Sequence, residues 1–312
     1  MNETRDSMKH RPVRLVVAVP MLLTLMVTLG CTGTTAAPTG PSGTGLEPRP
    51  PSSSMRFLVL KSDGEDLDNR YLSTVVVGAY PAFCSGVLVH PYLVLTAAHC
   101  VCLPHGGRKR VDTTTCVKRT AVTSYAYSRQ GDVYEMVPQS RQGTVRPHEN
   151  FEALLDDTMA VTGATSDLAV ILLDKPMEHV PLGFQLTGSS VEIDDELIVV
   201  GYGRTEVEGQ PGGRRLFGGN TITQKGRSNL TNMKDKDIVF LFERRGAHAF
   251  AGDSGGPCFR EDGQGRWLVG IVSQGNGRVS RFTSLYPHLL WLKDQLGRAD
   301  QLAEQSRGAK PL

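Results

Sequence analysis

The folded part of the chain is marked by short apolar runs separated by turns rich in glycine, proline and polar residues. Runs this short, dominated by Val, Ile, Leu and Phe, favour strands over helices. We expect strands at Phe57–Leu60, Thr74–Val77, Gly86–Val89, Leu93–Thr96, Leu168–Leu173, Leu197–Val200, Ile238–Phe242 and Trp267–Val272. Helical spacing occurs only near the end, where Leu289, Leu292 and Leu296 share one face. The pattern predicts an all-β domain closed by one C-terminal α-helix.

The first 31 residues have the layout of an export signal. Basic residues precede an apolar run from Leu15 to Gly30, which Pro20 interrupts; they are Lys9, Arg11 and Arg14. That run is too short and too broken to predict a membrane span by itself. We therefore expect an exported protein.

The apolar run ends in Val27–Cys31, which resembles the lipobox of bacterial lipoproteins. On this resemblance Cys31 becomes the lipidated first residue of the mature protein, held in the cell envelope. Ordinary cleavage further on, after Ala37, would release a secreted protein, and an uncleaved anchor is a third alternative.

Residues 32–54 consist largely of Thr, Gly, Pro and Ser without apolar periodicity, which predicts a linker. The domain organisation is then a signal peptide over 1–31, a linker over 32–54, a folded domain over 55–297 and a polar tail over 298–312. The formal net charge of +2 includes no basic block, so nothing indicates a nucleic-acid partner.

Candidate chemistry begins with the stretch Gly252–Pro257, where Ser254 lies between glycines and follows Asp253. Glycines allow a sharp turn and close approach to a substrate. A serine hydroxyl needs a base to accept its proton and donors to hold the resulting oxyanion. The sequence offers His99 directly after one apolar run and Asp167 at the head of another. Imidazole and carboxylate are the partners that a nucleophilic serine uses.

These residues and their order resemble the chymotrypsin/trypsin family of serine proteases, whose triad is a well-studied template. The match covers about residues 57–297 and rests on five stretches: Thr96–Cys100, Asp167–Leu173, Gly201–Gly203, Gly252–Pro257 and Trp267–Ser273. The resemblance implies two six-stranded antiparallel β-barrels with the active site in the cleft between them. It implies a serine endopeptidase with a polypeptide substrate and no cofactor, and we expect a monomer.

In this family Ser254 would be the nucleophile, His99 the general base and Asp167 the residue that orients His99. The resemblance also places the oxyanion hole at the backbone N–H groups of Gly252 and Ser254. Ser273 would support Asp167 and line the substrate channel.

A second enzyme fold shares part of the pattern, since Gly252-x-Ser254-x-Gly256 also fits the nucleophile elbow of α/β-hydrolases. That fold needs its acid and histidine after the serine, where Asp262 and His288 are available. The remaining segment is too short and does not alternate strands with helices, so this alternative is disfavoured.

The cysteines fit an exported protein. By resemblance Cys84 and Cys100 form the disulfide that anchors the histidine loop, and Cys102 with Cys116 would close the next loop. With Cys31 lipidated, Cys258 remains as a buried free thiol. The competing interpretation is a metal site, built from Cys100, Cys102, His105 and Cys116; we expect disulfides and no metal.

The substrate pocket departs from the family. By alignment on Ser254, His248 lies at the base of the pocket where trypsin has an aspartate, and Phe250 replaces a cysteine. Ser273, Gly275 and Gly277 would form the opposite wall, which is shortened. Cleavage after Lys or Arg is therefore not expected. Either His248 favours an acidic side chain or it fills an altered pocket.

The sequence leaves open how the protein is activated. In the family a newly cut N-terminal amine pairs with the aspartate that here is Asp253, but the usual start is absent. Arg56 is a candidate cleavage site ahead of Phe57. If no such N-terminus forms, the alternative function is a membrane-tethered binding protein, a catalytically silent protease homologue.

Overall fold

The computed structural model describes residues 58–59, 64–79, 82–104, 109–157, 160–204, 213–227, 238–243 and 246–308. All of them belong to one compact unit, Ser53–Leu312. The predicted leader with Cys31, the linker, Arg56 and His105 lie outside the described residues. Within the described stretches, no helix has the length and apolar character needed to cross a membrane.

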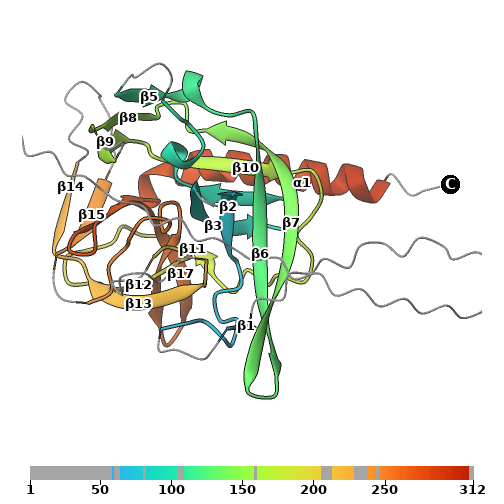
Figure 1. Ribbon diagram of the computed structural model, residues 1–312. Helices are drawn as coiled ribbons and strands as arrows, with labels where there is room; N and C mark the ends of the chain where they lie inside the picture. The colour runs from blue at the N-terminus through green and yellow to red at the C-terminus, as the bar shows by residue number, and fades with distance from the viewer. Residues whose placement is uncertain are drawn as a thin grey trace, which may run out of the picture. The chain divides into compact units, whose positions relative to one another are not determined.

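The first sheet closes into a six-stranded barrel with one further short strand at its side. Its strands are β1 (Leu58–Val59), β2 (Thr74–Ala79), β3 (Ala82–His90), β4 (Leu93–Thr96), β6 (Arg119–Gln130), β7 (Val133–Pro147) and β10 (Ala169–Leu173). Their order is β1-β7-β10-β4-β3-β2-β6, and pairing of β6 with β7 closes the barrel. Figure 1 shows β6 and β7 as a long green hairpin. Inward-facing apolar side chains, including Val75, Leu88, Val94 and Ile171, fill the interior.

The second sheet is built from the C-terminal half of the chain. Its strands are β11 (Gln185–Leu186), β12 (Glu196–Gly201), β13 (Leu216–Thr221), β14 (Gln224–Arg227), β15 (Ile238–Phe242), β16 (Pro257–Asp262), β17 (Gly265–Gly275) and β18 (Ser280–Ser284). The order is β13-β12-β16-β17-β18-β15-β14, with β11 paired to β17. Phe240, Phe242 and Phe282 pack together in its core. Among the described residues no ladder joins β13 to β14, so this sheet is curled rather than closed.

Smaller elements complete the domain. A three-stranded sheet contains β5 (Arg110–Asp112), β8 (Glu152–Leu155) and β9 (Val161–Thr165), and three 3-10 turns are η1 (Ala98–Cys100), η2 (Thr113–Thr115) and η3 (Tyr286–His288). The helix α1 (Leu289–Gly308) follows η3.

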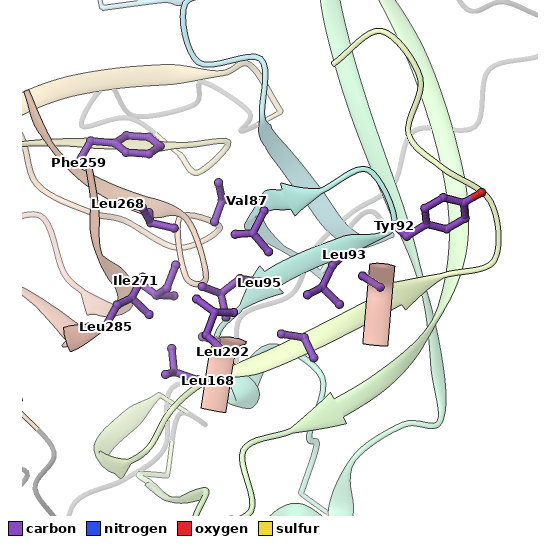
Figure 2. Packing of buried hydrophobic residues seen from close by; sticks show 14 of the residues in the cluster. Val87, Tyr92, Leu93, Leu95, Leu168, Phe259, Leu268, Ile271, Leu285 and Leu292 are labelled. Carbon is purple, nitrogen blue, oxygen red and sulfur yellow. The ribbon is translucent and has the colours of Figure 1, made fainter. Parts of the chain in front are cut away.

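A shared apolar core joins the two sheets and the helix (Figure 2). Leu95 comes from β4, Ile271 from β17 and Leu292 from α1, and each is at most 1% exposed. Burial of such side chains contributes roughly 1.5 to 3 kcal/mol each. This core holds the two sheets together, which matters because the candidate site draws residues from both.

A buried ion pair makes a second link between the halves. The Arg215 side chain is fully buried, and its Nε donates to Asp66 Oδ2 at 2.7 Å. Its Nη1 donates to the Tyr202 hydroxyl at 3.0 Å and to the Tyr125 carbonyl of β6 at 2.7 Å. The guanidinium therefore ties the segment before β2 to both sheets.

The fold class predicted from the sequence is confirmed: the protein is mostly β, with two barrel-like sheets and a C-terminal helix. The helix is longer than predicted. Residues 298–308, which the sequence analysis assigns to a polar tail, continue α1, with Ala299 and Ala303 buried against the domain.

Candidate active site

His99 lies on η1, directly after the fully buried strand β4, and its side chain is 14% exposed. Its Nδ1 lies 2.8 Å from Asp167 Oδ2, and its backbone N–H donates to Asp167 Oδ1 at 3.0 Å. Two contacts to one carboxylate fix both the position and the rotation of the imidazole ring. They leave Nε2 as the ring nitrogen that does not face the carboxylate.

Asp167 stays ionised although it is almost completely buried. Burial alone would raise the pKa of this carboxyl, but the charge of His99 and hydrogen bonds from His99 and Ser273 outweigh it, so the pKa is lowered. The Ser273 hydroxyl donates to Asp167 Oδ2 at 2.6 Å. Ser273, at the end of β17, thus brings the second sheet to the carboxylate.

The residue before Asp167 has a backbone conformation that is uncommon outside glycine. Ser166 has φ +45° and is 1% exposed. This left-handed residue turns the chain just before β10, which directs the Asp167 side chain toward His99. Such strain persists only where the surrounding structure fixes it.

Ser254 lies in the loop before β16 and is held by both sheets. The Ser85 N–H of β3 donates to the Ser254 carbonyl at 2.8 Å, and the Gly255 N–H donates to the Val272 carbonyl at 2.7 Å. Gly255 has φ +82°, and a Cβ there would lie 3.0 Å from Ala97 N. The loop is therefore in close contact with the segment between β4 and η1, just before His99. In the described part of the chain no hydrogen bond joins the Ser254 hydroxyl to His99.

The backbone N–H groups of Gly252 and Ser254 in this loop have no protein acceptor among the described residues. The Gly252 carbonyl, in contrast, accepts from the Ser85 hydroxyl at 2.8 Å. Gly252 has φ +102°, a conformation that L side chains rarely adopt. The loop thus offers a pair of N–H donors next to the serine.

Asp253 lies on the other side of the loop, beside a cavity of about 330 Å³ that we call the Asp253 cavity. Its carboxylate accepts from the Gly203 N–H at 2.7 Å and the Phe250 N–H at 2.9 Å. Burial raises the pKa of Asp253 to about 6, although these backbone hydrogen bonds act in the opposite direction. The cavity is also lined by Arg204 and His248, but no basic side chain in the described residues forms an ion pair with Asp253.

The residues assigned to the substrate pocket lie on segments that contact each other. The Gly277 N–H donates to the Ala249 carbonyl at 3.2 Å. His248 lines the Asp253 cavity, and its Nδ1 lies 3.2 Å from the Ser280 hydroxyl. The two segments that the resemblance describes as opposite walls, near Ala249 and Gly275, are in direct contact.

The cysteines are paired as the resemblance implies. Cys84 is bonded to Cys100 and Cys102 to Cys116. The three thiols that the metal interpretation required, those of Cys100, Cys102 and Cys116, are therefore in disulfide bonds. Cys258 is a buried free thiol, and burial raises its pKa well above the usual range. Such a thiol is unreactive.

Ser85 and Ser166 contribute to the site but were not predicted from the sequence. Ser85 follows Cys84 and carries no motif of its own; its partner Gly252 is 167 positions away. Ser166 precedes Asp167, yet a left-handed serine has no local sequence signal. Only the three-dimensional contacts reveal these two residues.

Comparisons with known proteins identify the family of the chain. A family model described as Trypsin matches residues 66–287. Phenoloxidase-activating factor 3 of Holotrichia diomphalia is 26% identical over 254 residues, which cover 72% of this chain and 66% of that protein. A trypsin-like protease of Streptomyces glaucescens is 25% identical over 209 residues, which cover 62% of this chain and 65% of that protein. The chain spans just under two thirds of the length of both relatives.

Among solved structures, a mutant of human heparin binding protein matches with a TM-score of 0.50 and 19% sequence identity. The match covers 73% of this chain and 92% of that protein. At this identity the likeness bears on the fold alone.

Proposed function

Because the chain belongs to the trypsin family, we propose that it is an exported serine endopeptidase that acts through Ser254, His99 and Asp167. The observation that carries the proposal is the 2.8 Å contact between His99 Nδ1 and the buried, ionised Asp167. A carboxylate at Nδ1 favours the tautomer with its proton there, so that Nε2 keeps a lone pair and can act as a base.

The proposed reaction has two halves. Ser254 Oγ bonds to the scissile carbonyl carbon while its proton passes to His99 Nε2, and the carbonyl oxygen becomes an oxyanion. Collapse of this intermediate breaks the C–N bond, and His99 returns the proton to the leaving amine. Water then attacks the acyl-enzyme in the same way and restores the serine.

The N–H groups of Gly252 and Ser254 would hold the oxyanion. Their lack of a protein acceptor in the described residues supports this role, because a donor that is already paired could not serve it. Removal of one such donor typically costs roughly 10²- to 10³-fold in rate.

The Asp253 cavity supports a proposal for how the protein is activated. In the family, the aspartate before the serine receives the amine of a newly cut N-terminus. Asp253 is a buried carboxyl without a basic partner in the described residues, and the cavity beside it leaves room for chain. We extend the proposal to cleavage after Arg56, which would free the amine of Phe57.

Export and anchoring complete the proposal. Two disulfides fit an oxidising compartment. The lipobox-like end of the leader would place a lipid on Cys31, so that the linker holds a monomeric domain at a membrane surface until cleavage after Arg56 separates the domain from its anchor. Mass spectrometry of the mature N-terminus tests this: a diacylated Cys31 is expected, and an unmodified start after Ala37 would contradict it.

The test of the enzymatic proposal is covalent labelling of the mature protein with a fluorophosphonate. Label on Ser254 is expected, and Ser254→Ala should abolish it. Ser140→Ala, which removes an exposed hydroxyl of β7 paired with Thr123, is the matched control and should label normally. Absence of serine-dependent label would favour the alternative, a tethered homologue that binds without cutting.

A further inference from the structure

The two segments beside Ser254 and Ser273 touch each other at Ala249 and Gly275. A Cβ added to Gly275 would lie 2.6 Å from the Ala249 carbonyl carbon and 2.7 Å from its Cβ. Real Cβ atoms essentially never approach other atoms so closely. The hydrogen bond from the Gly277 N–H to the Ala249 carbonyl, at 3.2 Å, joins the same two segments. No side chain fits between them as they stand.

The contact is made by a short, self-closed turn, Asn276–Val279, between β17 and β18. The Asn276 side-chain oxygen accepts from the Arg278 N–H at 3.0 Å and the Val279 N–H at 2.9 Å. The Asn276 N–H donates to the Val279 carbonyl at 3.2 Å. Asparagine that bonds its own backbone in this way fixes a turn. A turn so short and so bonded has little length with which to swing away from Ala249.

The Phe250 ring packs against the same turn. A Cβ on Gly277 would lie 2.5 Å from Phe250 Cζ, and Gly277 has φ +77°. The aromatic ring is therefore in contact with the turn backbone itself. Only glycine at position 277 satisfies both the backbone conformation and the approach of the ring.

Ser280 makes a further contact with the segment that carries Ala249. Ser280 is fully buried, and its hydroxyl accepts from the Ala249 N–H at 2.8 Å and lies 3.2 Å from His248 Nδ1. His248 is thus in contact with Ser280, and it also lines the Asp253 cavity. The two segments are therefore joined at several points.

We propose that the enzyme cleaves after glycine, because the contact between Ala249 and the Asn276–Val279 turn leaves no room for a side chain. This inference rests on the proposed function and names its substrate class. A larger residue before the scissile bond has to break the Gly277–Ala249 hydrogen bond and displace the Phe250 ring. Affinity for the rest of the peptide then comes from its backbone and its other side chains. Asn276 and Phe250 are accordingly specificity-determining residues.

The test compares peptides that differ only in the residue before the scissile bond, with Gly, Ala, Leu, Glu and Lys at that position. We expect kcat/KM to fall from Gly to Ala and to be at least about 100-fold lower for Leu, Glu and Lys. Preference for any of the three large residues would overturn the inference. Preference for Glu alone would instead support the hypothesis that His248 favours an acidic side chain.

Two variants distinguish an effect of the turn on specificity from a general loss of activity. Asn276→Gly removes the side-chain acceptor and loosens the turn, so we expect the ratio of kcat/KM for Gly over Leu to fall about 10-fold, chiefly because the value for Leu rises. Arg278→Ala changes an exposed side chain in the same turn and should leave the ratio unchanged. Equal ratios in all three proteins would show that the turn does not set specificity.

Hydrogen exchange gives a readout that does not depend on activity. In the full mature chain carrying Ser254→Ala, the Gly277 amide should exchange at least about 100-fold more slowly than in an unstructured peptide, because it is bonded to Ala249. Fast exchange would mean that the walls are apart and would overturn the inference even in a protein that labels. Absence of fluorophosphonate label, with a protected Gly277 amide, would instead reject the proposed function and leave the closure supported.

Discussion

The Ser85 hydroxyl of the first sheet donates a hydrogen bond to the Gly252 carbonyl oxygen of the serine loop at 2.8 Å. The same hydroxyl accepts from the Tyr202 N–H at 3.0 Å. The carbonyl that it holds belongs to the peptide between the two N–H groups proposed for the oxyanion hole. Its orientation therefore influences the direction of both donors.

We predict that Ser85→Ala lowers kcat about 10-fold with little change in KM. The reason is that loss of one hydrogen bond lets the Gly252 peptide rotate, which weakens transition-state stabilisation rather than substrate binding. Steady-state kinetics on a glycine-containing peptide measures both constants. Ser140→Ala serves as the control for loss of a hydroxyl at the surface.

Two other outcomes for Ser85→Ala would contradict this prediction. If KM rises while kcat is kept, Ser85 acts on substrate binding. If neither constant changes, the loop keeps its shape without this hydrogen bond.

A second prediction concerns Gly252 itself. Gly252→Ala places a Cβ 2.8 Å from Gly203 Cα at a residue with φ +102°, so the peptide has to turn away from its present direction. We expect kcat to fall at least about 100-fold, as for loss of an oxyanion donor. Gly263→Ala, where a Cβ meets nothing within 4 Å, should retain full activity. Kinetics with circular dichroism on both variants distinguishes a misdirected donor from an unfolded protein.

Elements with a continuous apolar run were predicted well from the sequence. Leu93–Thr96 is fully buried along its length and was predicted with its observed bounds. The hairpin of β6 and β7 was missed, because exposed and half-buried residues interrupt its apolar positions. The extension of α1 was missed for a related reason: its buried residues there are Ala299 and Ala303, whose small side chains give little periodic signal.

The residues of the candidate site also fall into two groups: those that a local sequence pattern predicts and those that it does not. Short motifs marked Ser254, His99 and Asp167, because each chemistry-bearing residue lies in its own local pattern. The contact of Gly275 with Ala249 has no such pattern, since it depends on how two distant turns meet. On our proposal, long-range contacts of this kind decide substrate preference. Local sequence patterns do not reveal such contacts.

The third prediction tests the ion pair between Arg215 and Asp66. Arg215→Met keeps much of the side-chain volume but leaves the Asp66 carboxylate buried without its partner. We expect the free energy of unfolding to fall by about 3 to 5 kcal/mol. Arg119→Ala, which removes a half-exposed partner of Asp174, should cost less than about 1 kcal/mol. Urea denaturation measures both, and equal losses would mean that burial of the pair is unimportant.

The last prediction concerns pH and Asp253, whose pKa is raised by burial from an ordinary value of 3.8 to about 6. The folded protein therefore binds this proton more tightly than the unfolded chain does. The resulting stabilisation is fully present below about pH 3.8 and is lost as pH rises through about 6. A shift of roughly two units corresponds to about 3 kcal/mol.

Asp167 acts with the opposite sign and at lower pH, because its pKa is lowered from 3.8 and its contribution to stability is lost only as pH falls below that value. The difference in unfolding free energy between the wild type and Asp253→Asn isolates the contribution of Asp253. We expect this difference to change by up to about 3 kcal/mol between pH 4 and pH 7, with the wild type losing stability relative to the variant.

The same difference reports on activation. If an N-terminal amine freed by cleavage after Arg56 pairs with Asp253, the carboxylate gains a cation and its pKa drops, so the pH dependence should disappear in the cleaved protein. Urea denaturation of cleaved and uncleaved protein at each pH provides the comparison. A pH dependence that survives cleavage unchanged would mean that the new terminus does not reach Asp253, and activation would then have to come from elsewhere in the chain.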